Sequence, residues 1–228
     1  MIANKKKFSS GLLLMVAFCV VLVLMFMPLF GGKNGLQYMD DLYNSISKGS
    51  ANYIGKARAD AEQFAGQQVS VTVKMKSAAQ AEQTARMLNA AGALVNTADS
   101  TLKVSGDLGQ ILFASLDDAQ LMYDNNGAAV RDKYGFDERQ VLYNWWTANE
   151  AMVGDFNRQE QFKMAKTLTT VNTKAVEAAY NYYGVESQKI SERLGIVIFS
   201  LVFYVIYTLW YGFGIMYLFE GWGMRLEH

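Results

Sequence analysis

The chain has 228 residues, of which 51% are hydrophobic, and its 21 basic and 21 acidic side chains cancel to a formal net charge of zero. It has no basic stripe interleaved with aromatic residues, so we expect no nucleic-acid partner. Cys19 is its only cysteine and His228 its only histidine, which excludes an internal disulfide and leaves no histidine for a metal or catalytic site within the chain.

The first apolar segment, residues 11–30, contains no charged residue. A helix rising ~1.5 Å per residue needs about 20 such residues to cross a hydrocarbon core ~30 Å thick, so a transmembrane helix is predicted. The preceding Lys5–Lys7 place residues 1–10 in the cytoplasm under the positive-inside rule. A cleaved signal peptide is the competing interpretation, but its apolar core is usually ~7–15 residues and ends in small residues. This segment ends in Met27-Pro28-Leu29-Phe30, so we expect an uncleaved anchor.

Residues 31–66 are predicted to be a helical, membrane-proximal segment, and residues 67–127 a small α+β subdomain. Within the latter, alternating valines from Val69 to Val73 predict a half-buried strand, and two shorter strands are expected at 94–97 and 101–105. Ser77 and Asp107 are predicted to cap the two helices. The order strand, helix, strand, strand, helix is most of a ferredoxin-like split βαβ unit with a small antiparallel sheet. No fourth strand is evident.

Residues 128–193 are predicted to form one or two long helices, because apolar positions keep helical spacing and no proline intervenes. Gly154 and Gly184 are the expected bends, and the helix would continue into the second span. Trp145 and Trp146 point to different sides of a helix, so we expect one in the core and the other at the surface. Both are candidate partner contacts.

Residues 194–219 form the second predicted transmembrane helix, and residues 220–228 the cytoplasmic tail, whose last three residues resemble the start of a cloned tag. Four aromatic residues recur at helical spacing on one face of this helix: Tyr204, Tyr207, Trp210 and Tyr211. A buried tyrosine hydroxyl needs a hydrogen-bond partner, and lipid tails offer none. We therefore expect this face to contact the first helix or a neighbouring subunit, with a quinone or pigment as the alternative.

The sequence contains no recognisable catalytic set. It has no complete phosphate-binding loop and no dinucleotide, zinc-protease or serine-hydrolase motif. Asp117, Asp118 and Asp124 do not match the spacing of a calcium-binding EF-hand, and we interpret them as a solvated helix face. We expect no enzymatic activity, no cofactor and no metal.

These features predict a membrane protein of the α+β class, in which two transmembrane helices flank an extracytoplasmic domain with a small antiparallel, ferredoxin-like sheet and long helices. We expect it in the bacterial inner membrane, with both termini cytoplasmic and the central domain periplasmic. The predicted function is that of a non-catalytic accessory or structural subunit of a larger complex, whose partners are other membrane proteins or further copies of itself. The alternatives are an extracytoplasmic sensing module that signals through a partner, and a homo-oligomeric pore.

Overall fold

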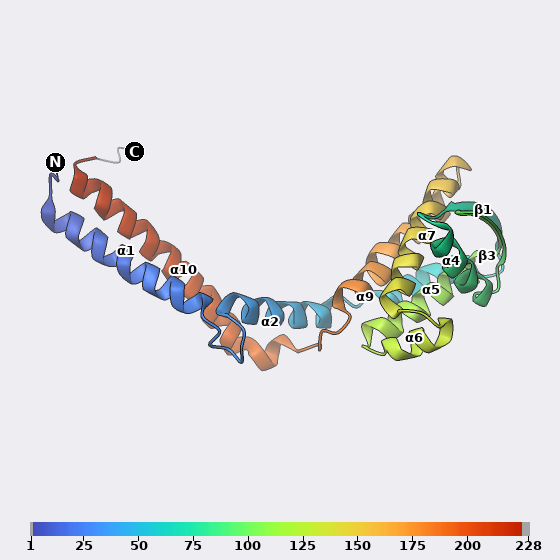
Figure 1. The fold of residues 1–228 in the computed structure, drawn as a ribbon, viewed down its shortest axis with the longest axis horizontal. Coiled ribbons are helices and arrows are strands. Elements are labelled where there is room, and N and C mark those ends of the chain that lie inside the picture. The colour runs from blue at the N-terminus through green and yellow to red at the C-terminus, as the bar shows by residue number, and fades with distance from the viewer. Residues whose placement is uncertain (1, 225–228) are drawn as a thin grey trace. The chain divides into compact units, whose positions relative to one another are not determined.

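The computed structural model describes residues 2–224 and divides the chain into two compact units (Figure 1). The first, the hairpin unit, is built from both ends of the chain, up to Ser47 and from Ser187 onward. The second, the central domain, is Lys48–Glu186. The structure is therefore of the α+β class. Helices form both ends of the chain, and the three-stranded sheet belongs to the central domain.

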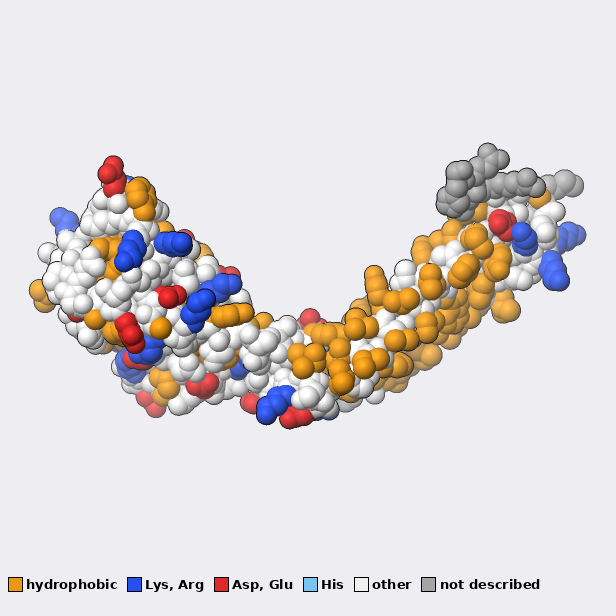
Figure 2. Space-filling model, turned by 180° about the vertical axis from the view of Figure 1, so that it is seen from behind, with side chains coloured by type: hydrophobic (Ala, Val, Ile, Leu, Met, Phe, Trp, Pro, Cys, Tyr) orange, Lys and Arg blue, Asp and Glu red, His pale blue; other side chains and the backbone are white. Residues whose placement is uncertain are grey.

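The hairpin unit contains two helices that are long and apolar enough to cross a membrane, α1 (Lys5–Phe26) and α10 (Ile190–Trp222). They lie side by side in antiparallel orientation, and α1 ends just before Pro28, where helical backbone is disfavoured. A third helix, α2 (Gly35–Ser50), begins in this unit. Only 6% of the most apolar window of each helix is buried within the protein, and Figure 2 shows hydrophobic side chains exposed along this unit, which suggests a membrane location.

The sheet of the central domain consists of β1 (Gln68–Lys74), β2 (Leu94–Ala98) and β3 (Thr101–Asp107), in the order β1-β3-β2 with both pairs antiparallel. The three predicted strands are confirmed, and the odd-numbered valines of β1 are buried as their alternation indicated. Ser77 accepts a hydrogen bond at the start of α4 (Ala78–Ala90), and Asp107 does so at the start of α5 (Leu108–Tyr123). Both predicted caps are therefore confirmed.

The outer edge of β1 is covered by α7 (Glu138–Arg158). The backbone N–H of Thr72 donates to the Asp155 carboxylate at 2.8 Å, and the Gln159 amide donates to the Ser70 carbonyl at 3.1 Å. An exposed strand edge would otherwise offer these groups to another strand. The described residues 2–224 contain no fourth strand in this sheet, and side chains of α7 and of Gln159 just after it occupy the position where one would pair with β1.

The remaining helices surround one hydrophobic core. They are shorter and more numerous than the one or two long helices predicted for residues 128–193. They are α3 (Ile54–Glu62), α6 (Gly127–Tyr134), α8 (Phe162–Val171), the π-helix η1 (Asn172–Val176) and α9 (Glu177–Tyr182). The predicted bend at Gly154 is wrong, since α7 runs through it and the break comes at Glu160, whose φ is 60°. Gly184, with φ of 85°, follows the end of α9. The predicted unbroken connection into the second span is also wrong, because residues 183–189 are not helical.

A buried carboxylate organises the core of the central domain. Asp118 is completely buried and accepts hydrogen bonds from Trp145 Nε1 at 2.8 Å, the Tyr134 hydroxyl at 2.7 Å and Lys133 Nζ at 2.8 Å. A buried carboxylate is tolerated only when charge and donors surround it in this way. The interpretation of Asp118 as part of a solvated helix face is therefore wrong, although neighbouring Asp117 does lie at the surface, paired with Arg58.

The chain enters and leaves the central domain at a buried lysine, which we call the Lys48 clamp. Lys48 Nζ donates to the carbonyls of Val185 at 2.7 Å and Tyr182 at 3.2 Å, and to Asn125 Oδ1 at 3.0 Å. The Tyr123 hydroxyl donates to the Lys48 carbonyl. Burial lowers the pKa of the Lys48 ammonium below its usual range, and the three acceptors offset part of the cost of desolvating it. The two ends of the domain are thereby held together.

An ion pair between Arg131 of α6 and Glu138 of α7 is a second charged feature of the central domain. Both Glu138 carboxylate oxygens accept from the Arg131 guanidinium, at 2.8 and 2.9 Å, and one also accepts from the Tyr183 hydroxyl at 2.8 Å. These hydrogen bonds, chiefly those from Arg131, lower the pKa of Glu138 from 4.5 to about 2. The folded state therefore favours the ionised carboxylate.

We predict that Asp118→Ala lowers the free energy of unfolding by about 3–5 kcal/mol, because it leaves the Trp145 and Tyr134 donors buried and unpaired. Asp117→Ala is the matched control and should change it by about 0–1 kcal/mol, since its ion pair is exposed. Urea unfolding of the detergent-solubilised chain, followed by circular dichroism, measures both. Equal losses in the two variants would contradict the role given to Asp118.

We also predict that Glu138→Gln destabilises the protein near neutral pH but not in strong acid. A depressed folded-state pKa contributes stability above the unfolded value of 4.5, and this contribution is lost as pH falls towards about 2. Unfolding curves recorded in steps across that range should show the difference between wild type and variant shrinking to zero. A difference that stays constant over the range would refute the assignment.

Candidate functional site

The two long helices of the hairpin unit meet along a seam that contains three glycines. A Cβ atom on Gly11 would lie 2.7 Å from the backbone nitrogen of Leu218, and one on Gly221 would lie 2.6 Å from the Cα of Phe8. A Cβ on Gly214 would lie 2.8 Å from the Met15 sulfur of α1, a flexible side chain that can move aside. Small residues at helix interfaces allow close approach of backbones in this way. The seam therefore depends on glycine at positions contributed by both helices.

Close approach brings two of the four predicted aromatic residues against the backbone of α1. The Trp210 indole N–H donates to the Leu14 carbonyl at 3.0 Å, and the Tyr207 hydroxyl donates to the Phe18 carbonyl at 3.3 Å. The rings of Tyr207 and Phe18 stack with centroids 4.2 Å apart. Tyr207 and Trp210 therefore find their partners within the hairpin itself.

The other two predicted residues, Tyr204 and Tyr211, both keep a large exposed surface, although the Tyr211 ring also contacts Phe18 of α1 with centroids 5.1 Å apart. Their exposed fractions are 69% and 44%, and neither hydroxyl has a hydrogen-bond partner among the described residues. Thr208 lies between them on the same surface, and its hydroxyl donates to the Tyr204 carbonyl at 2.7 Å. We call Tyr204, Thr208 and Tyr211 the hydroxyl face. It places two unpaired polar atoms on the part of α10 that runs alongside α1.

An ion pair and a backbone hydrogen bond close the seam near the chain ends. Lys7 Nζ lies 2.6 Å from a carboxylate oxygen of Glu220, and the Asn4 N–H donates to the Gly221 carbonyl at 2.9 Å. Phe8 and Trp222 make a ring contact at 5.9 Å in the same region. Aromatic and basic residues of this kind are typical of a membrane–water interface.

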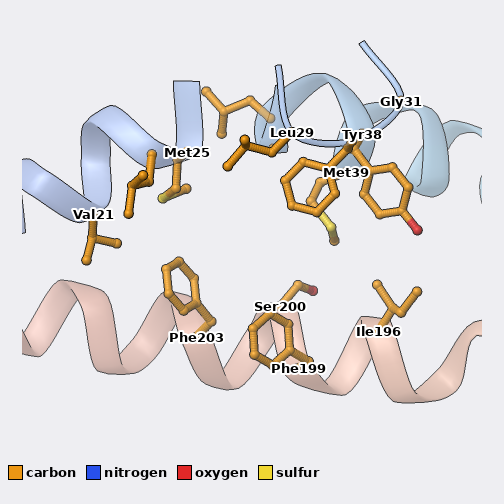
Figure 3. A pocket seen from close by; sticks show the side chains of 14 residues that line it. Val21, Met25, Leu29, Gly31, Tyr38, Met39, Ile196, Phe199, Ser200 and Phe203 are labelled. Atoms are coloured by element: carbon orange, nitrogen blue, oxygen red, sulfur yellow. The ribbon is translucent and has the colours of Figure 1, made fainter. Parts of the chain in front are cut away.

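The opposite end of the hairpin holds an apolar pocket of about 810 Å³ between α1, α2 and α10 (Figure 3). Phe199 and Phe203 of α10 face Leu29, Tyr38 and Met39 across it. The hydroxyl of Ser200, which also lines the pocket, donates to the Val197 carbonyl and lies 2.6 Å from that of Tyr43. Its size is within the ~300–1,000 Å³ range of small-molecule sites, and most of its lining residues are apolar.

The two remaining predicted contacts, Trp145 and Trp146, belong to the central domain. Trp145 is fully buried, with its indole bonded to Asp118, and Trp146 is 36% exposed. Of the two indoles, only that of Trp146 is available at the surface of this fold. Sequence reasoning missed the Lys48 clamp, because nothing in the spacing of Lys48 and Asn125 indicates that residues 77 positions apart meet.

The described residues contain no group of three or more histidine, cysteine, aspartate or glutamate side chains that could hold a metal ion. Comparison with family models, with curated proteins and with solved structures finds no match to the chain. The features that define the site are therefore the glycine seam, the hydroxyl face and the apolar pocket of the hairpin unit.

We predict that Gly11→Ala weakens the hairpin by about 1–3 kcal/mol, because the added methyl group has no room against the α10 backbone. The same substitution at Gly195, where a Cβ would meet nothing within 4 Å, should be neutral or stabilising by up to about 1 kcal/mol, since alanine favours helix. Titration of both variants with a denaturing detergent, monitored by circular dichroism, compares them. The seam is disproved if Gly11→Ala is the more stable.

Proposed function

We propose that this protein is a non-catalytic two-pass membrane protein that acts as an accessory or structural subunit of a larger assembly. The observation that carries the proposal is the hydroxyl face. The hairpin provides acceptors for the Tyr207 hydroxyl and the Trp210 indole N–H, but it leaves the Tyr204 and Tyr211 hydroxyls unpaired. Inside a bilayer, neither water nor lipid tails can pair with these two hydroxyls. A second membrane protein that supplies acceptors would remove this cost.

The direction of insertion follows from charge. Lys5–Lys7 favour a cytoplasmic N-terminus, and an antiparallel pair of spans returns the C-terminus to the same side. We propose that the central domain lies on the opposite, extracytoplasmic side, in an inner membrane of bacterial type. It would then present a folded surface there while the hairpin holds the protein in the bilayer.

The architecture of the central domain is compatible with this role. Its order β1-α4-β2-β3-α5 corresponds to the first five elements of a ferredoxin-like split βαβ unit. We propose that it is a shortened version of that architecture, in which α7 replaces the last strand at the β1 edge. Folds of this kind serve many functions, so the proposed role rests on the hairpin.

We predict that replacing both Tyr204 and Tyr211 by phenylalanine lowers the amount of partner that co-purifies with the chain about tenfold. Loss of two hydrogen bonds worth about 0.5–1.5 kcal/mol each in an apolar environment accounts for that change. Gentle detergent extraction of the native membrane, native mass determination and identification of the proteins that travel with the chain provide the measurement.

Tyr217→Phe is the matched control, because it removes a tyrosine hydroxyl from another side of the same helix, where Tyr217 lines a shallow hollow with Leu14 and Trp210. It should leave the partner ratio unchanged. A complex whose composition is the same in the double variant would refute docking through the hydroxyl face. A lone monomer would indicate the sensing alternative instead of a subunit, and a ring of identical copies the pore.

A further inference from the structure

A second pocket, of about 220 Å³, opens on the surface of the central domain between α7 and the helical turns that follow α8. Leu142 and Val176 are completely buried and form its apolar base. Three aromatic side chains surround it, Tyr143 and Trp146 from α7 and Tyr180 from α9. Glu177, at the start of α9, completes the lining. The pocket has no role in the hairpin contacts described above.

The three aromatic rings line an open surface, and two of them stack against each other. Tyr143 and Trp146 lie nearly parallel, with an angle of 15° between ring planes and 6.3 Å between centroids. Trp146 and Tyr180 are each more than a third exposed. The face of an aromatic ring carries negative electrostatic potential and attracts a cation within about 6 Å of its centroid. The rings of Tyr143 and Tyr180 already show this attraction toward cations of the protein itself.

Those resident cations are Lys76, whose Nζ lies 5.1 Å from the Tyr143 centroid and bonds its hydroxyl, and Arg139, whose Cζ lies 5.7 Å from the Tyr180 centroid. Neither side chain lines the pocket. The one charged residue that does is Glu177, and its carboxylate has no ion pair or hydrogen bond within residues 2–224. The one charge on the pocket lining itself is therefore negative, while Lys76 and Arg139 place positive charge beside two of its rings.

We propose that this pocket binds a small organic cation with alkyl groups on nitrogen, of the trimethylammonium type. A bare ammonium ion is too strongly hydrated to enter an apolar, aromatic space, whereas an alkylated one gains from apolar contact, from the ring faces and from the Glu177 carboxylate. An anion would be repelled by that carboxylate, and a neutral apolar molecule would leave it unused. Free choline and the choline headgroup of a lipid share the required chemistry.

The test is calorimetric titration of the full chain, in a detergent without an ammonium group, with choline and with its uncharged isostere 3,3-dimethylbutanol. Choline should bind at least about tenfold more tightly, because the two differ only in charge. Glycerophosphocholine, titrated in parallel, separates the sources: tighter binding than choline indicates a lipid headgroup, and weaker binding a free cation. Equal binding of choline and 3,3-dimethylbutanol, or no saturable binding of either choline compound, would overturn the proposal.

Two variants test the residues. Glu177→Gln should weaken choline binding about fivefold to tenfold, and Trp146→Leu by about tenfold, because each removes one source of attraction at the surface without altering a buried residue. Glu82→Gln, an exposed carboxylate of α4 outside the pocket, is the matched control and should bind as the wild type does. Circular dichroism verifies that each variant is folded. Unchanged affinity in folded Glu177→Gln would overturn the assignment.

Discussion

The structure depends on one constraint, that removing a polar group from water costs free energy unless the group finds a hydrogen-bond partner. In the hairpin unit the constraint acts on the aromatic residues of α10. Backbone carbonyls of α1 can serve Tyr207 and Trp210 because a carbonyl oxygen has a second lone pair free after its helical hydrogen bond. They come within reach only because glycines let the helices approach, so hydrogen bonding and steric fit support each other along the seam.

The same constraint shapes the central domain, where a carboxylate and an ammonium group are buried. Asp118 has three donors from three different side chains, and Lys48 has three acceptors from two separate parts of the chain. Such groups contribute less to the net free energy of folding than to the selection of a single packing arrangement. Any rearrangement of α6, α7 or α9 would leave a charge without partners. Specific packing here follows from polar groups that tolerate only one arrangement.

Much of the fold could be predicted from the sequence, because local patterns determine it. The alternation in β1, the caps Ser77 and Asp107 and the two apolar helices all depend on residues close together in the chain. The helix break at Glu160 could not be predicted, because nothing in the sequence indicates that a glutamate will adopt a positive φ. Gly154 was a misleading signal, since glycine permits a bend without requiring one.

The candidate site was only partly predictable for a similar reason. Periodicity places Tyr204, Tyr207, Trp210 and Tyr211 on one face of α10, but only the packing against α1 decides that Tyr207 and Trp210 reach backbone acceptors. The burial of Asp118 depends on helices that follow it by 16 to 27 residues, and the Lys48 clamp on a contact 137 residues away. Tertiary packing, not local propensity, determines these features.

The separation in sequence between the partners of the seam has a consequence for how the protein is made. Lys7 and Glu220 are 213 positions apart, so the ribosome must synthesise nearly the whole chain before α1 meets α10. Until then α1 lacks the helix against which it packs, while the intervening domain closes a loop of its own at Lys48. The contacts that α1 makes with α10 therefore form only after the whole central domain has been synthesised.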